Sequence, residues 1–376
     1  MTIEKVECWV FRAPIEQPVS AAVGSMTNRP AVFLRISADD GAWGWGEVFC
    51  NFPTVGAEHR ARIVLDIIAP LIEGTPSNQP AATWHQLTQR LRRMALQAGE
   101  PGPLAQAIAG VDQALWDMQA RRAAQPLWRL LAADMPQAGN RVRLYASGLG
   151  PDRAAETALA KQAQGFTAFK FKVGFHPDKD LDDFASMRAA LGPRAQIMID
   201  ANQAWEPGTA ARRIAALEHY DPFWIEEPLA ADEPLSVWRE LAGSTSVPLA
   251  AGENIREHVN FEAAIGNGHL RFIQPDVAKW GGITGCLAVA RHAQQAGLVF
   301  CPHWLGGGVG LAASMHLRAA LGPEGLVEVD ANPNPLREQV CVPGRLEEGW
   351  LSLPDTPGIG VEPDLATLSE YRVELG

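Results

Sequence analysis

Eight short apolar runs recur between residues 140 and 330 at nearly constant spacing, and this repeat constrains the fold more than any other feature. Successive runs start 24 to 28 residues apart. A parallel strand needs a crossover of a dozen or more residues, usually a helix, to reach the next strand. Eight such repeats favour a closed TIM-type barrel over an open doubly wound sheet, which rarely keeps so even a period. The predicted strands are Val142–Ser147, Ala168–Lys172, Gln196–Asp200, Pro222–Glu226, Val247–Ala251, Arg271–Gln274, Leu298–Cys301 and Leu326–Val329.

A different pattern precedes the repeat. Alternating apolar residues predict strands near Val6–Val10, Ala31–Ile36 and Trp43–Val48, and Asp39–Gly41 supplies a turn between the last two. Apolar residues at helical spacing follow. Strands followed by helices indicate an α+β unit over residues 1–130.

The barrel is predicted to occupy residues 131–339. Residues 340–376 break its period, because a strand at Leu351–Pro354 is followed by turn residues and no further helix. We expect this segment to return to the N-terminal sheet and complete the α+β unit.

Composition excludes several classes of partner. Lys+Arg 32 against Asp+Glu 43 gives a formal net charge of −11, unlike the basic surfaces that bind nucleic acids or anionic membranes. No apolar run reaches the roughly 18–20 residues that span a bilayer. The N-terminus lacks a secretory signal pattern, and the five cysteines form no C-x-x-C pair. We therefore expect a cytoplasmic protein that binds neither nucleic acid nor membrane.

Ionisable residues stand at the carboxyl ends of six successive predicted strands, from the second to the seventh. In a barrel these ends face one another and carry the chemistry. One Asp after a strand is usually a cap or turn residue, and one strand-end Lys is usually solvated. Six in succession are not explained in that way. The residues are Lys170 with Lys172, Asp200, Glu226, Glu253, Asp276 and His303.

Asp200, Glu226 and Glu253 follow three adjacent strands, which places three carboxylates together. Such a cluster repels itself unless a cation pairs with it. An all-oxygen ligand set favours Mg²⁺, with Mn²⁺ as the alternative, over zinc. Three protein ligands also leave coordination positions open for water and substrate oxygens.

Candidate bases flank this cluster. Lys170 and Lys172 share one face of their strand by its period of two, and Asp276 is one strand away from His303. An aspartate that reaches an imidazole fixes its tautomer and raises its basicity. Two bases beside a Lewis acid suit the removal of a proton α to a carboxylate, through an enediolate intermediate.

These residues resemble the enolase superfamily, and within it the mandelate racemase/muconate lactonizing enzyme family, mandelate racemase subgroup. The resemblance covers nearly the whole chain. It rests on the segments GWGE (44–47), AIAGVDQALWD (107–117), FKFKVG (169–174), IDAN (199–202), WIEEPL (224–229), AGENI (251–255), QPDVAKWGGITG (274–285) and PHWLGGGVGL (302–311).

The resemblance implies a modified (β/α)7β barrel with an α+β capping domain that the C-terminal tail completes. It implies that Asp200, Glu226 and Glu253 are the Mg²⁺ ligands. It implies that Lys172 is the base on one face of the substrate, with Lys170 beside it. On the other face, His303 with Asp276 is the base or acid. Glu328 resembles an acid that hydrogen-bonds a substrate carboxylate, and Asn202 an amide near the α-hydroxyl. The substrate is then a small carboxylate, and we expect the enzyme to be a homo-oligomer.

The reaction that follows proton removal stays open. If His303 protonates a leaving β-hydroxyl, a sugar acid is dehydrated to a 2-keto-3-deoxy acid, which is the first hypothesis. If His303 returns the proton to the α-carbon, the enzyme is a racemase or epimerase of a 2-hydroxy acid or related carboxylate. Related lactonizing enzymes carry a second catalytic lysine at the end of strand six, where this chain has Asp276, with Lys279 three residues later.

Two other classes remain as alternatives. A Schiff-base aldolase would use Lys170 or Lys172 and would not need three carboxylates on adjacent strands. A non-catalytic binding protein would have no reason to keep both bases. Gly44–Glu47 is expected to be scaffold only. Gly306–Gly308 either presents backbone N–H groups to an anion at a helix start or forms a flexible turn.

Overall fold

A barrel of parallel strands forms the centre of the molecule. The structure is a computed structural model that describes residues 1–21, 24–132, 135–150, 153–174 and 179–375. Hydrogen bonds connect the barrel strands in the order β10-β9-β8-β7-β6-β5-β4-β11. The strands are β4 (Arg141–Leu149), β5 (Ala168–Lys172), β6 (Gln196–Asp200), β7 (Ile225–Glu226), β8 (Leu249–Ala251), β9 (Phe272–Ile273), β10 (Val299–Phe300) and β11 (Leu326–Asp330).

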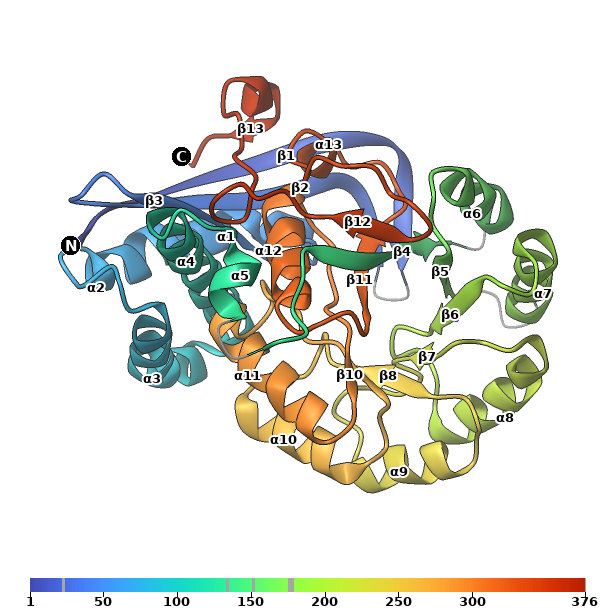
Figure 1. The fold of residues 1–376 in the computed structure, drawn as a ribbon. Coiled ribbons are helices and arrows are strands. Elements are labelled where there is room, and N and C mark those ends of the chain that lie inside the picture. The colour runs from blue at the N-terminus through green and yellow to red at the C-terminus, as the bar shows by residue number, and fades with distance from the viewer. Residues whose placement is uncertain (22–23, 133–134, 151–152, 175–178, 376) are drawn as a thin grey trace.

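Helices alternate with these strands and form an outer ring around them (Figure 1). The sheet is nearly closed: β10 and β11 meet where the Leu326 N–H lies 3.3 Å from the Cys301 sulfur. This arrangement confirms the (β/α)7β barrel. The helices are α6 (Ala154–Ala163), α7 (Asp180–Leu191), α8 (Pro207–Leu217), α9 (Leu235–Gly243), α10 (His258–Asn267), α11 (Gly282–Gln295) and α12 (Gly308–Ala319).

The barrel interior is a packed apolar layer to which every strand or its immediate neighbour contributes one side chain. Trp224 lies edge-on to Tyr145 and 4.8 Å from Phe272 between ring centroids. Large and small residues thus fill the interior, as barrels of this size require. The layer consists of Tyr145, Ala168, Met198, Trp224, Ala250, Phe272, Cys301 and Leu326.

An antiparallel sheet and a group of helices precede the barrel. The sheet contains β1 (Ile3–Ala21), β2 (Gly24–Ala38) and β3 (Trp43–Val48). A Cβ on Gly46 would lie 2.0 Å from the Gly110 carbonyl oxygen, so glycine at this position of β3 lets a helix approach the strand closely. The helices are α1 (Ala57–Arg62), α2 (Ala69–Ile72), α3 (Pro80–Ala98), α4 (Pro101–Arg122) and α5 (Leu127–Leu131).

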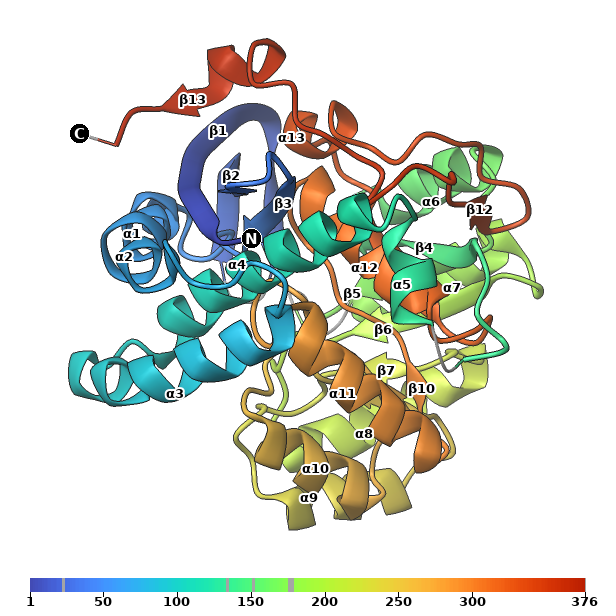
Figure 2. The ribbon, with the colours of Figure 1, turned by 60° about the vertical axis from the view of Figure 1, so that its left-hand side comes forward.

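The C-terminal tail serves both sheets, which corrects the expectation for its strand. The strand β12 (Trp350–Ser352) pairs antiparallel with Arg141–Arg143 of β4, because β4 begins before its barrel neighbours and leaves backbone groups to be paired. The return to the N-terminal sheet occurs later, where β13 (Arg372–Val373) pairs with Val10 and Phe11 of β1 (Figure 2). A short helix, α13 (Pro335–Glu338), precedes both.

Across the described ranges, none of the helices combines the length and the apolar character needed to cross a membrane.

Candidate active site

A ring of polar side chains lies directly above the apolar interior layer. Because side chains alternate along a strand, the second residue after an interior residue faces the same side. Seven of the eight strands place a buried polar group at this position, at the carboxyl end of the barrel. The exception is β8, where Gly252 takes the position with a φ of +154° and Glu253 follows. The seven are Ser147, Lys170, Asp200, Glu226, Gln274, His303 and Glu328.

Lys170 is the cation at the centre of the ring and is only 1% exposed. Its Nζ lies 2.5 Å from Glu226 Oε1, 2.8 Å from Glu328 Oε1 and 3.5 Å from Asp200 Oδ2. Burial alone would lower the pKa of Lys170, but the charges of Glu226 and Glu328 outweigh it and hold the pKa well above its usual value. Lys170 is therefore a fixed positive charge beside these carboxylates.

Lys172 lies next to Lys170 but is more accessible. Its Nζ lies 3.1 Å from Asp200 Oδ2 and donates a hydrogen bond to Asn202 Oδ1 at 2.6 Å. Burial opposes the charge of Lys172, and the attraction of Asp200 exceeds that effect, so its pKa is raised. The structure thus holds this amine between one carboxylate and one amide oxygen.

His303 stands across the ring from the lysines, between two carboxylates. Its Nδ1 lies 2.6 Å from Asp276 Oδ2, and its Nε2 contacts Glu253. The other oxygen of Asp276 accepts the N–H groups of Ala278 and Lys279, which fixes the carboxylate in place. Burial would lower the pKa of His303, but Glu253 and its other acidic neighbours raise it well above the usual value.

Lys279 approaches Glu253 from the side on which Phe49 lies. Within the described residues, no hydrogen bond joins Lys279 to His303. Its Nζ donates to Asn254 Oδ1 at 2.8 Å, lies 3.6 Å from Glu253 Oε1 and is 5.0 Å from the centre of the Phe49 ring. The Asn254 amide in turn donates to Glu227 and Glu253. Lys279 is thus part of a network that holds Glu253 in position.

Several of these groups were not predicted from the sequence. Ser147 donates a hydrogen bond to Glu328, and Gln274 Nε2 donates to Glu226 Oε2 at 2.7 Å. The alternation rule alone could have found both, because each lies two residues after an interior side chain. The alternation of side chains gave no such signal for Glu227. Its pKa is raised well above the usual value, first by burial and then by repulsion from Glu253.

The donor set fits a divalent cation. Burial raises the pKa of Glu226 to about 7, and neighbouring carboxylates add to the effect. Among the described His, Cys, Asp and Glu side chains, no three converge on a common metal position, because lysine ammonium groups and the imidazole lie against their oxygens. Six carboxyl groups face four cations when His303 is protonated, and burial and mutual repulsion raise the pKa of Glu226 and Glu227, so an added cation would favour their ionised form. The carboxylates are Asp200, Glu226, Glu227, Glu253, Asp276 and Glu328, and the cations are Lys170, Lys172, Lys279 and His303.

The capping sheet is attached to the loop that follows His303. The Glu47 carboxylate at the end of β3 accepts the Gly307 N–H at 2.6 Å and the Gly310 N–H at 2.9 Å, at the start of α12. The glycine-rich segment therefore does present N–H groups at a helix start, and they bind a carboxyl group of the protein itself rather than a free anion. Glu47 also orients the loop in which the Trp304 N–H donates to Glu328 Oε2.

The barrel carries a capping sheet, and its carboxylate cluster has lysines on one side and a His–Asp pair on the other. This combination defines a class of enzymes that act next to a substrate carboxylate. Residues 153–367 match the enolase C-terminal domain-like family. Residues 5–132 match the mandelate racemase/muconate lactonizing enzyme N-terminal domain. The chain belongs to the mandelate racemase/muconate lactonizing enzyme family of the enolase superfamily.

Two characterised relatives resemble the chain over most of its length. It is 30% identical to a D-galactarolactone cycloisomerase of Agrobacterium fabrum over 99% of each protein. It is 33% identical to a D-galactonate dehydratase of Ralstonia nicotianae over 90% of each. Members of this family are lyases or isomerases, and this chain is an enzyme of that kind.

Solved structures agree with this assignment. A mandelate racemase/muconate lactonizing enzyme from Bordetella bronchiseptica RB50 is 46% identical, with a TM-score of 0.91 over 99% of both chains. A racemase from Streptomyces coelicolor A3(2) with bound magnesium is 29% identical, with a TM-score of 0.87 over 99% of this chain and 100% of that one. Enolase superfamily members bind Mg²⁺.

Proposed function

We propose that this enzyme removes the proton α to the carboxylate of a sugar acid and then eliminates the β-hydroxyl, forming a 2-keto-3-deoxy acid. The observation that carries the proposal is the placement of two bases on opposite sides of one carboxylate cluster. Lys172 ends β5 and His303 follows β10, and Asp200, Glu226 and Glu253 lie at or just after the ends of β6, β7 and β8 between them. The dehydratase among the relatives supports the choice of substrate class.

Asp200, Glu226 and Glu253 would hold Mg²⁺, with Mn²⁺ as an alternative ion. When bound, the ion supplies Lewis-acid stabilisation of the charge that grows on the substrate carboxylate. Lys170 adds a fixed positive charge there, because its ammonium group is buried among Glu226 and Glu328. Glu328 would donate a hydrogen bond to a substrate carboxylate oxygen only in its protonated form, because in the structure Lys170 outweighs burial and lowers its pKa, and it accepts from Ser147 and the Trp304 N–H.

The neutral amine form of Lys172 takes the α-proton onto Nζ; a cation held by Asp200 would offset the carboxylate charge that otherwise raises the pKa of this amine. Asn202 orients both the amine and the substrate α-hydroxyl. Electrons from the broken C–H bond form the enediolate. They then form a double bond as the β-hydroxyl leaves with a proton from His303 Nε2, releasing water. The resulting enol becomes the 2-keto acid. Asp276 keeps the Nδ1 side of the imidazole occupied, so the Nε2 proton faces the substrate.

Racemisation or epimerisation is the second candidate. Neighbouring carboxylates raise the pKa of His303, and its imidazole lies across the cluster from Lys172, so it can also return a proton to the α-carbon from the opposite side. The cycloisomerase and racemase among the similar proteins support an isomerase reaction. The same two bases would act in both reactions, and the substrate decides which one follows.

The test incubates the Mg²⁺-loaded enzyme with a panel of aldonic and aldaric acids in D₂O. Keto-acid formation is measured with semicarbazide, and α-deuteration by NMR. For a dehydratase, Lys172→Ala should lose both signals, whereas His303→Asn should still exchange the α-proton and form no keto acid. For an isomerase, each variant should exchange only one stereoisomer. Lys161→Ala, on the outer helix α6, is the matched control and should behave as wild type. Full turnover by either active-site variant would refute the two-base reaction.

We also propose that residues 1–130 with 340–376 form the capping domain, and residues 131–339 the catalytic barrel. The pairing of β13 with β1 supports this division for the end of the tail, whereas β12 in the same tail pairs with β4 of the barrel. All five cysteines are free thiols, which supports a cytoplasmic location. Self-association of the chain stays a prediction, which sedimentation velocity tests.

A further inference from the structure

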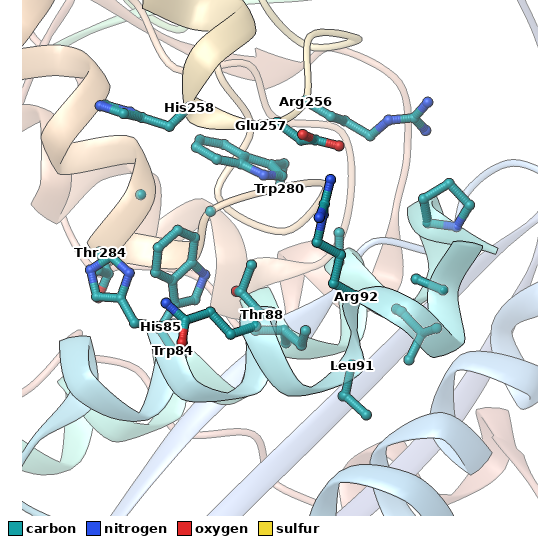
Figure 3. Close-up of a pocket in the computed structure, with 18 of the residues that line it drawn as sticks. Trp84, His85, Thr88, Leu91, Arg92, Arg256, Glu257, His258, Trp280 and Thr284 are labelled. Atoms are coloured by element: carbon teal, nitrogen blue, oxygen red, sulfur yellow. The ribbon is translucent and has the colours of Figure 1, made fainter. Parts of the chain in front are cut away.

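A second concave site lies at the junction between the N-terminal helices and the barrel helices. It is a pocket of about 490 Å³ between α3, the start of α4, the start of α10 and α11. None of the polar residues at the carboxyl ends of the strands lines it. Figure 3 shows the α3 side with Trp84, His85 and Arg92, and the opposite side with Arg256, Glu257 and Trp280.

The floor of this pocket is apolar and aromatic. The rings of Trp84 and Trp280 meet edge to face, with centroids 6.0 Å apart and an interplanar angle of 86°. Leu91 and Ile108 extend the same surface. Its volume lies within the range of roughly 300–1,000 Å³ found for small-molecule sites, which combine an apolar lining with a few placed polar groups.

The rim carries two arginines and one glutamate, a formal net charge of +1. Arg92 and Arg256 both line the pocket, and among the described residues neither guanidinium has a hydrogen bond or an ion pair. Arg92 points from α3 toward the side that carries Arg256 and Glu257 (Figure 3). The Arg256 Nη1 would lie only 3.3 Å from a Cβ on Gly102, which places it at the start of α4. Glu257 is the one carboxylate among the lining residues.

We propose that this pocket binds a small organic anion with a flat aromatic body. Its anionic group would lie between Arg92 and Arg256, whose planar guanidinium groups suit carboxylate, sulfonate and phosphate oxygens. Its aromatic body would pack on Trp280 and Trp84. The indole rings of Trp84 and Trp280 offer flat apolar surface, which favours an aromatic body over the hydroxyl-bearing chain of a sugar acid, although Thr88, Gln89 and Thr284 also line the pocket. The ligand class therefore differs from the substrate class proposed for the barrel.

The experiment uses 8-anilinonaphthalene-1-sulfonate as the probe, because it is an aromatic anion whose fluorescence reports binding. The full-length Mg²⁺-loaded protein is titrated with it, and so are Arg92→Met and Arg256→Met. Arg93→Met is the matched control, because Arg93 is exposed on the same helix and does not line the pocket. N-phenyl-1-naphthylamine, which lacks the sulfonate, separates the charge contribution from the apolar one. Thermal unfolding confirms that every variant is folded.

The expected result is one saturating site per chain, with affinity for the sulfonate reduced about tenfold in Arg92→Met and in Arg256→Met and unchanged in Arg93→Met. The uncharged probe should bind all four proteins equally. Absence of binding to wild type, or equal sulfonate affinity in all variants, would overturn the proposal. Sedimentation velocity adds a further outcome: if Arg92→Met or Arg256→Met dissociates an oligomer, the pocket is a contact between copies and the ligand proposal is wrong.

Discussion

Replacing Glu47 by glutamine removes a buried titratable group from the contact between β3 and the start of α12. The carboxylate is 2% exposed and accepts the N–H groups of Gly307 and Gly310. Burial raises its pKa from an ordinary 4.5 to about 8, an effect that these N–H groups reduce and the charge of Asp276 increases. Glutamine has nearly the same shape and does not titrate. One of the two N–H groups then faces its NH2 group, a cost that does not vary with pH, so the pH dependence of the difference reports the charge.

The sign follows from proton binding in the two states. Below pH 4.5 the carboxyl is protonated in both the folded and the unfolded chain, and it adds no pH dependence. Between pH 4.5 and 8 the unfolded chain has released a proton that the folded chain still holds. The free energy of unfolding of the wild type therefore falls as the pH rises, by about 1.4 kcal/mol per pH unit and about 5 kcal/mol in total. Glu47→Gln lacks this loss.

Urea unfolding of both proteins between pH 5 and 9, followed by tryptophan fluorescence, measures this difference. Other titrating groups are common to both proteins, so they cancel when the two curves are subtracted. We expect Glu47→Gln to gain stability relative to wild type steadily from pH 5 to 8 and to level off above it. Glu4→Gln, at an exposed position of β1, is the control and should give a flat difference. A flat difference for Glu47→Gln would refute the assignment of a buried, protonated carboxyl.

Three further outcomes follow from contacts in the structure. Lys279→Met should weaken Mg²⁺ binding about 10- to 100-fold in calorimetric titration of the metal-free protein, whereas Lys279→Arg should retain most of the affinity. Arg29→Met should lower the free energy of unfolding by about 3 kcal/mol, the low end for breaking a buried ion pair, because Asp330 stays buried and keeps only the more distant Arg337 Nη1 at 3.6 Å; a loss below 1 kcal/mol would contradict this. Gly310→Ala places a Cβ 2.0 Å from an indole ring and should impair folding, whereas Gly266→Ala meets no atom within 4 Å and should be tolerated.

The repeat of strands and helices, and the side of each strand that carries polar groups, could be read from the sequence because both are local properties. A crossover needs a minimum number of residues, and side chains alternate along a strand wherever it lies. Lys170, Asp200 and Glu226 could be predicted at one end of the barrel for that reason. The same alternation would have added Ser147 and Gln274.

Only the tertiary structure decides which groups meet across the chain. Glu47 lies 260 residues before Gly307, and nothing in either segment names the other as its partner. Lys279 is close to Asp276 in sequence, yet its ammonium group turns to Glu253 and Asn254, because side-chain direction in a loop depends on the surrounding packing. The tail strand likewise pairs with the backbone groups that the start of β4 leaves unpaired by its barrel neighbours. Spacing along the sequence therefore predicts the framework, and three-dimensional packing assigns the charge partners.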